Sequence, residues 1–158
     1  MATRSTIWAT FEDGSVKGVY CHNDGYLSYN GEILIRRYAS QPLAEKLVSL
    51  GALSTLDENP DPLELAAPKR PWMVGDIPAN KHSFNSPQKG VVIAYHRDRN
   101  EPFMQHQGID GKPDQEAFEQ FNYWWFDGAW HIHKGNDEWA VLTKEYIEED
   151  SLVDEDDE

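Results

Sequence analysis

The sequence predicts an α+β domain in which an antiparallel sheet of about four or five strands, built from two hairpins, has two or three helices packed on one face. Two segments rich in aromatic and β-branched residues are each interrupted by an Asp-Gly pair, at 13–14 and 127–128. Between them, apolar residues over 28–50 recur at helical spacing. The 158 residues are 39% hydrophobic and 12% aromatic, which is enough apolar surface for a packed core.

Residues 5–21 form the first predicted hairpin. An Asp-Gly pair between strand-forming runs indicates a two-residue type I′ turn, because both central residues must take positive φ. Such a turn places Phe11 opposite Val16. It also places Ile7 opposite Tyr20.

Residues 121–134 form the second predicted hairpin, again with a two-residue turn at its Asp-Gly pair. Alternate residues of a strand share a face, so this hairpin has one apolar face and one face with polar and aromatic side chains. The facing pairs on the two sides are Trp125 with Trp130, Tyr123 with Ile132, Trp124 with His131, and Asn122 with His133.

Two consecutive helices are expected between the hairpins. Ser28 or Asn30 can cap the first, which ends near Tyr38. Ser40 can cap the second and Gly51 can end it, because glycine readily takes the left-handed conformation that stops a helix. The apolar stripe of the second helix is Leu43, Leu47 and Leu50. A short strand is expected over 90–95 and a brief helix over 114–120.

The chain is expected to hold a single globular domain over residues 1–147. Within it, residues 57–88 contain six of the nine prolines without a steady period and predict a long loop. Residues 148–158 are expected to be a disordered acidic tail, because like charges repel and little apolar surface is available there. The acids of this tail are Glu148, Glu149, Asp150, Asp154, Glu155, Asp156, Asp157 and Glu158.

The net charge of −14 is unevenly distributed along the chain. Residues 145–158 contain nine acids and no base, and without them 19 acids face 14 bases, a charge of −5. Direct binding of nucleic acid or of an anionic membrane surface is therefore not expected, since both need clustered Lys and Arg. A partner protein with a basic surface fits better.

The single cysteine, Cys21, excludes an intrachain disulfide and favours a reducing compartment. Together with the lack of a secretory signal and of a membrane-spanning apolar run, this predicts a protein of the cytoplasm, either of the cell that makes it or of the cell in which it acts. Cys21 and His22 are neighbours on a strand, so they face opposite ways and are not preset as a nucleophile and base. An inert thiol is expected.

No enzyme motif is found, so the protein is predicted not to be an enzyme, with no cofactor. His131 and His133 share a strand face, and His22 with Asp24 could approach from elsewhere. A zinc site needs three or four converging ligands, and only two are expected to share a face. We therefore expect a solvated strand face and no metal.

Three places could hold a ligand or partner. The segment 20–26 is either a simple turn, with Gly25 at positive φ, or a binding loop. Alternate arginines at 97 and 99 could hold a phosphate, although ordinary ion pairs are the competing interpretation. The candidate residues are Tyr20, His22, Asp24, Tyr26, Arg97, Arg99, Trp124 and His131.

Several segments of the chain are distinctive: the opening MATRSTI, EDG at 12–14, YCHNDGY at 20–26, HSFNSPQ at 82–88, YHRDR at 95–99, and FDG with Trp130. Together they resemble a family of small tailed-bacteriophage proteins. The resemblance covers most of the chain up to about Leu142, although Asn23 stands where family members have tryptophan. The loop at 57–80 and the acidic tail are particular to this chain. The resemblance implies a phage protein that acts in the host bacterial cytoplasm, and it implies no catalytic residue.

The sequence thus favours a non-enzymatic phage accessory protein that binds a bacterial host protein, such as a defence enzyme, nuclease or transcription factor, and inhibits or redirects it. Two alternatives stay open. One is an inhibitor that mimics DNA, with acids spaced like phosphates over a folded surface. The other is a sponge for a nucleotide immune signal. A homodimer is also open.

Overall fold

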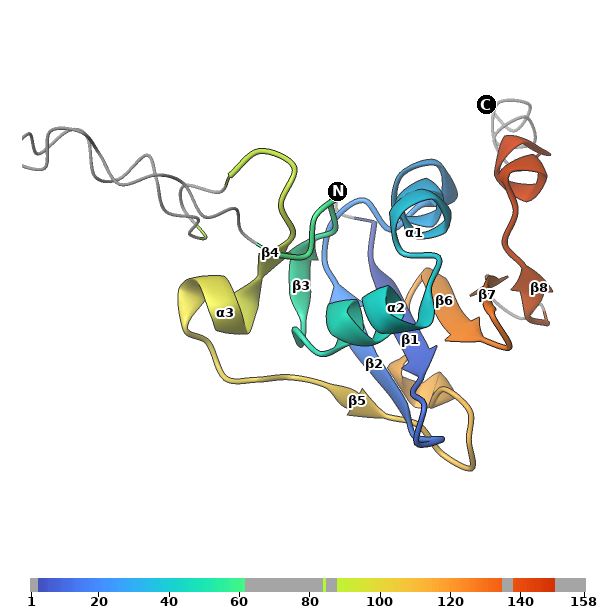
Figure 1. Ribbon diagram of the computed structural model, residues 1–158, viewed down its shortest axis with the longest axis horizontal. Coiled ribbons are helices and arrows are strands. Elements are labelled where there is room, and N and C mark those ends of the chain that lie inside the picture. Colours follow the sequence, from blue (N-terminus) through green and yellow to red (C-terminus); the bar gives the residue numbers. More distant parts are fainter. Residues whose placement is uncertain (1–2, 62–83, 85–87, 135–137, 150–158) are drawn as a thin grey trace, which may run out of the picture.

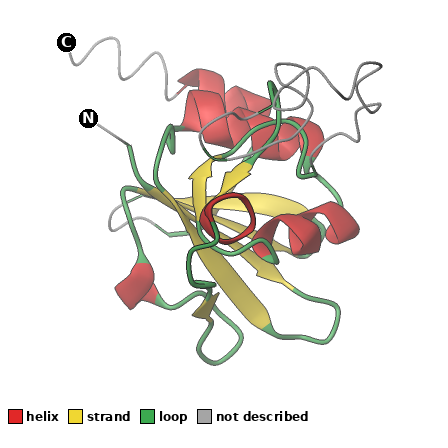
Figure 2. Ribbon diagram, turned by 90° about the vertical axis from the view of Figure 1, so that its left-hand side faces the viewer, coloured by secondary structure: helices red, strands yellow, loops and turns green. Residues whose placement is uncertain are grey.

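The computed structural model describes residues 3–61, 84, 88–134 and 138–149, and these residues form one mixed sheet of eight strands with helices around it (Figures 1 and 2). The strand order is β4-β3-β2-β1-β6-β7-β8, and β5 pairs with β2. The strands are β1 (Ser5–Thr10), β2 (Val16–Cys21), β3 (Leu53–Thr55), β4 (Ile93–Ala94), β5 (His106–Gln107), β6 (Phe121–Phe126), β7 (Ala129–His133) and β8 (Ala140–Val141).

The α+β class is confirmed, but the expected antiparallel sheet of four or five strands is wrong in two respects. β1 pairs with β6 in parallel, with Ile7 opposite Tyr123, and β2 pairs in parallel with β3. The two hairpins pair through their first strands, β1 and β6. Because a long stretch of chain connects them, these strands can run parallel as well as antiparallel. The extra strands have two or three residues each, too few to show a period in the sequence.

The second hairpin has the predicted register. All four predicted pairs are present, from Asn122 opposite His133 to Trp125 opposite Trp130. Asp127 and Gly128 have φ of 53° and 74°, so both central residues occupy the left-handed region that a type I′ turn demands.

The first hairpin is shifted by one residue from its predicted register. Val16 lies opposite Thr10 rather than Phe11, and Val19 rather than Tyr20 lies opposite Ile7. The turn spans residues 11–15, because the Phe11 amide donates to the Ser15 carbonyl at 2.7 Å. A longer loop replaces the two-residue turn.

The helices around the sheet are η1 (Leu27–Gly31, a π-helical turn), α1 (Glu32–Arg37), α2 (Gln41–Val48), α3 (Tyr95–Arg99) and η4 (Gln115–Ala117). Residues 144–149 are also helical, and Ile147 is buried against the core. The Ser40 hydroxyl accepts from the Leu43 amide at 3.4 Å, and Gly51 has φ of 82°, so the predicted cap and stop of α2 are confirmed.

Two predictions for local structure are wrong. Asn30 is buried and donates to the Ser5 hydroxyl at 3.2 Å, and η1 has no side-chain cap, so neither Ser28 nor Asn30 caps the first helix. The expected strand over 90–95 is reduced to β4, and the chain turns into α3 at Tyr95. The Asp98 carboxylate accepts from the Ala94 amide at 2.8 Å and holds this turn.

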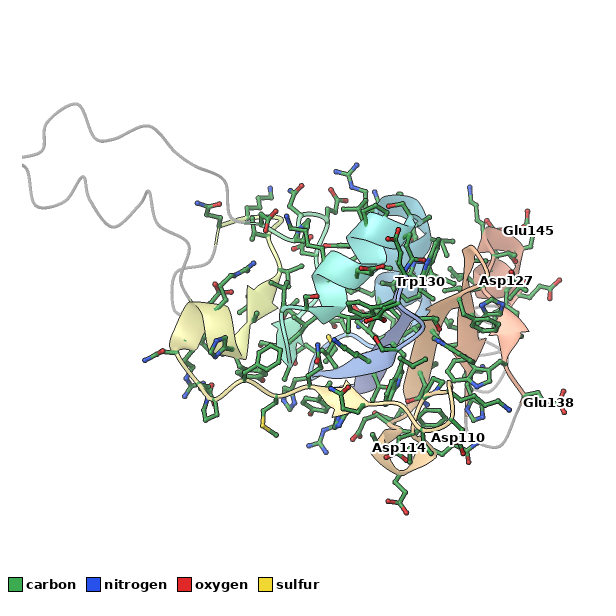
Figure 3. The ribbon with its side chains drawn as sticks, turned by 60° about the horizontal axis from the view of Figure 1, so that its bottom comes forward. Asp110, Asp114, Asp127, Trp130, Glu138 and Glu145 are labelled. Atoms are coloured by element: carbon green, nitrogen blue, oxygen red, sulfur yellow. The ribbon has the colours of Figure 1, made fainter. Side chains whose placement is uncertain are left out.

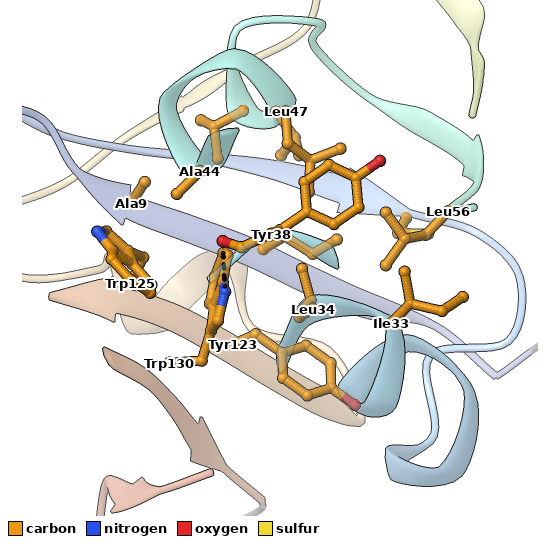
Figure 4. Packing of buried hydrophobic residues seen from close by; sticks show 14 of the residues in the cluster. Ala9, Ile33, Leu34, Tyr38, Ala44, Leu47, Leu56, Tyr123, Trp125 and Trp130 are labelled. Carbon is orange, nitrogen blue, oxygen red and sulfur yellow. Dashed lines mark hydrogen bonds between the residues drawn. The ribbon is translucent and has the colours of Figure 1, made fainter. Parts of the chain in front are cut away.

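The main core lies between the sheet and helices α1 and α2 (Figure 4). The Trp130 indole donates to the Tyr38 carbonyl at 3.0 Å, which ties β7 to the end of α1. Large side chains of this core that are almost completely buried are Trp130, Tyr38, Tyr123, Ile7, Leu34, Leu47, Leu53 and Leu56.

The opposite face of β2 has no room for a methyl group at Gly18, because an added Cβ would overlap the Trp8 ring. We predict that Gly18→Ala destabilises the fold by about 1–3 kcal/mol, as overpacking of a filled core does. Denaturant unfolding measures the loss. In a Trp8→Leu background the same change should cost much less, and an equal cost in both backgrounds would contradict this explanation.

Candidate functional site

The second face of the sheet carries a smaller core, which we call the aromatic face. Its buried members are Trp8, Val16 and Trp124, and Ala117, Phe118, Phe126 and Trp139 pack against them. The Trp8 and Trp124 indoles donate to the Thr6 and Thr10 hydroxyls at 2.8 and 2.9 Å, which satisfies both buried N–H groups. The sequence had predicted a solvated face here.

His131 and His133 belong to this buried layer, since each is only 9% exposed. The His131 ring stacks on Phe126 at 3.7 Å between centroids. The His133 ring lies 5.0 Å from Phe118 and 5.2 Å from Trp139, and its Nδ1 has no hydrogen-bond partner among the described residues. The prediction of a solvated strand face is therefore wrong: residues from η4 and from the β8 side cover it.

A network of hydrogen bonds around Asn122 lies on the same face. The Thr6 hydroxyl donates to Asn122 Oδ1 at 2.6 Å, and the Asn122 amide donates to the carbonyls of Glu119 and His133. These bonds fix the segment that follows η4 to the sheet. Within the described part of the chain, no group of three or more His, Cys, Asp or Glu side chains is arranged to hold a metal ion.

A cleft of about 640 Å³ lies beside the aromatic face. It opens between β2, the chain that runs from α3 to β5 (Figure 1), and η4. Its volume falls within the range of about 300–1,000 Å³ that is typical of ligand pockets. The lining residues are Tyr20, Ala52, Tyr95, Glu101, Pro102, Met104, His106, Glu116, Ala117 and Glu119.

Each aromatic ring of the cleft is held by another ring. Tyr20 lies 5.9 Å from His22, with its hydroxyl 2.7 Å from His22 Nδ1. Tyr95 packs 5.5 Å from Phe84. His106 stacks on the buried Trp8 at 5.8 Å. The rings therefore have little freedom to collapse into the cleft.

The charged residues of the lining are three glutamates. Arg99 Nε lies 3.4 Å from Glu101 Oε2, an exposed ion pair at the border of the cleft. Glu116 and Glu119 have no ion-pair partner among the described residues. Burial raises the pKa of Tyr20, with a smaller contribution from Glu119 in the same direction and an opposing one from Arg4.

The rim of the cleft exposes two large apolar side chains, Phe103 at 46% and Met104 at 61%. Phe103 lies over Gly51, where an added Cβ would come within 2.9 Å of its ring, and it meets His96 edge to face at 5.5 Å. The Met104 carbonyl accepts from the Ala52 amide at 2.9 Å. The backbone of this rim is thus anchored although its side chains face solvent.

The structure disperses the residues that the sequence singled out. Tyr20 lines the cleft and His22 supports it, while Tyr26 packs on Tyr29 at 6.2 Å before η1. Trp124 and His131 belong to the aromatic face. The predicted binding loop is therefore not one site, because its side chains point to different parts of the fold.

The turn at 22–25 differs from the predicted one. Asp24, with φ of 58°, takes the left-handed conformation that was expected of Gly25. Gly25 is required for close packing instead, since an added Cβ would lie 2.7 Å from Ser5 Cβ and 2.9 Å from the Thr3 carbonyl. Its carbonyl accepts from the Tyr123 hydroxyl at 2.6 Å.

The arginine pair does not form a phosphate site. Arg97 donates to the carbonyls of Pro60 and Val92 and pairs with Asp98 at 2.8 Å. Arg99 lies over the Phe84 ring at 4.7 Å and pairs with Glu101. Residues 95–99 form helix α3 rather than a strand. The two arginine side chains therefore point in different directions, whereas alternate residues of a strand would have pointed the same way.

Cys21 is fully buried, and burial raises the pKa of its thiol to about 11, as expected for an inert group. Of the acidic tail, Glu148 and Glu149 are exposed in the helix at 144–149. Residues 150–158 and most of the 57–88 loop lie outside the described residues.

Sequence reasoning missed most of the cleft. Tyr95 ends the strand expected over 90–95, and Glu116 and Glu119 lie in the helix expected over 114–120, but nothing in these short segments marks them as neighbours in space. His106 joins them because β5 pairs with β2 through Gly18. The only local signal is that glutamates and aromatic residues both occur over residues 95–120, and this is too weak to define a site.

Burial lowers the pKa of His131 below its usual value near 6.5, against smaller opposing effects that include its contact with the Ala129 carbonyl. The unfolded chain then binds this proton more readily than the folded one. We predict that the free energy of unfolding falls as pH drops below about 6.5, by at most about 1.4 kcal/mol per pH unit for this group.

Chemical unfolding between pH 5 and 8 measures this dependence. His131→Phe keeps a ring against Phe126 and removes the titration, so its profile should be flatter than that of the unmodified chain. His96→Gln changes an exposed histidine and serves as the control. Identical profiles for His131→Phe and the unmodified chain would contradict the assignment.

No helix in the described residues is both long and apolar enough to cross a bilayer. No family model, curated protein or solved structure matches this chain.

Proposed function

We propose that this chain is a non-enzymatic bacteriophage accessory protein that binds a bacterial host protein through a basic segment of that protein, and so inhibits or redirects it. The observation that carries the proposal is the cleft, in which three aromatic rings, each in contact with another ring, lie near Glu116 and Glu119, two carboxylates without an ion-pair partner among the described residues. A positively charged segment of the partner protein would complement the negative charge of the cleft.

The rim supports protein binding rather than catalysis. Phe103 and Met104 project beside the cleft, and aromatic and methionine side chains are enriched at protein interfaces. A few such anchors supply most of the binding energy of an interface, while surrounding acids speed encounter with a basic partner. The excess of 28 acids over 14 bases adds to that attraction.

The setting comes from the resemblance to small tailed-bacteriophage proteins. Within this proposal the host target is a defence enzyme, nuclease or transcription factor, because such a protein offers a basic surface that complements the cleft. Such proteins carry basic surfaces because they bind nucleic acid.

The alternatives are less well supported by the cleft. A nucleotide sponge needs cationic groups for phosphate, whereas the cleft is lined by glutamates and Arg97 is engaged with Pro60 and Val92.

A DNA mimic would use acids on the folded surface rather than the cleft. Asp110, Asp114, Asp127, Glu138 and Glu145 project outward from several elements around β6, β7 and β8 (Figure 3).

The test is affinity capture from bacterial lysate with matched charge variants. We expect the unmodified chain to capture a basic protein stoichiometrically, and Glu116→Gln with Glu119→Gln to weaken binding about tenfold, because two charge-assisted contacts are lost. The control is Glu138→Gln with Glu145→Gln, which removes the same charge at exposed positions outside the cleft.

Equal loss in both double variants would contradict the cleft and favour DNA mimicry by the folded surface. Loss on deleting residues 150–158 alone would assign binding to the tail. Capture of no protein at either low or moderate salt would contradict the whole proposal.

A further inference from the structure

We infer that the cleft receives an arginine side chain of the partner, with its planar guanidinium group against the rings and its nitrogens on the glutamates. This inference rests on the proposed function and names the chemical group that the cleft selects. Lysine and polyamines, which carry compact ammonium groups, are the alternatives that the geometry disfavours.

The rings favour a planar cation. Tyr20, Tyr95 and His106 are held in place by His22, Phe84 and Trp8, so three ring surfaces are fixed before any ligand enters. A guanidinium group stacks on such surfaces and is weakly hydrated, whereas an ammonium group holds its water more tightly. Fixed rings also lower the cost of ordering the site on binding.

The carboxylates supply matching acceptors. Glu101 is already ion-paired with Arg99, whose Nε lies 3.4 Å from Glu101 Oε2, so the other two glutamates are the main acceptors for a partner's arginine. Glu116 and Glu119 lie on the η4 side with no ion pair among the described residues. The forked N–H groups of a guanidinium can bond to more than one carboxylate at once.

The chain already shows the same combination at the border of the cleft. The Arg99 guanidinium carbon lies 4.7 Å from the centre of the Phe84 ring, and its Nε faces Glu101. Phe84 is the ring that supports Tyr95. An arginine from the partner would likewise meet an aromatic ring, Tyr95, and carboxylates, on the cleft side of the Phe84–Tyr95 pair. The apolar lining at Ala52, Pro102 and Met104 would contact its methylene groups.

The experiment is a titration of the full chain followed by amide NMR. The probes are N-acetylarginine amide, N-acetyllysine amide, N-acetylcitrulline amide and spermidine. We expect saturable shifts at the cleft residues with the arginine probe and about fivefold weaker binding of the lysine probe. Citrulline has the shape of arginine without its charge, so it should not saturate the site.

Variants separate the rings from the charges. Tyr20→Leu should weaken the arginine probe about fivefold, and Tyr20→Phe should restore it because the ring returns without the hydroxyl. Glu116→Gln with Glu119→Gln should weaken both cationic probes, while Glu138→Gln with Glu145→Gln should change neither. Dispersed spectra show that each variant is folded.

Equal or tighter binding of lysine or spermidine would overturn the inference while leaving a basic partner in place. Shifts outside the cleft, or none, with the arginine probe would also overturn it. The capture experiment with the unmodified partner protein reports on the proposed function separately, because it measures loss on glutamate replacement whichever cation the partner supplies.

Discussion

The parallel pairing of β1 with β6 holds the rest of this structure together. It joins two hairpins that are far apart in the sequence, and it places β1 at the centre of the sheet with neighbours on both sides. Ile7, Trp8 and Ala9 are all fully buried in consequence. A central strand of this kind buries alternate residues on opposite faces, so both faces of the sheet must be covered.

The two faces are covered in different ways. Helices α1 and α2 cover one of them, and Leu34 of α1 and Leu47 of α2 belong to the same core cluster as Tyr123 of β6 (Figure 4). The other is covered by η4, Trp139 and the chain leading into β5, which leave the Trp8 ring between His106 and Phe118. On this face the sheet is covered by side chains from short, mostly irregular segments. The cleft lies where two of them, residues 101–106 and residues 116–119, approach each other.

The cleft therefore takes its rigidity from the aromatic face. Trp8 supports His106, and the Thr6–Asn122 bond fixes the segment that carries Glu119. Its charge has a different origin, because the glutamates come from segments that contribute little to either core. Rigid rings and exposed carboxylates can thus coexist in one site, since different parts of the chain supply stability and charge.

The sequence by itself determined the elements whose interactions are local. The register of the β6–β7 hairpin follows from a two-residue Asp-Gly turn, and α2 follows from the Ser40 cap and the Gly51 stop. The inert thiol follows from the strand position of Cys21, which faces away from its neighbour His22. Only the tertiary structure decided the rest. Thr6 and Asn122 are 116 residues apart, and no local pattern encodes whether their strands run parallel or what covers them. Because the burial of His131 and His133 and the lining of the cleft depend on segments that are far apart in the sequence, they could be found only once the chain was folded.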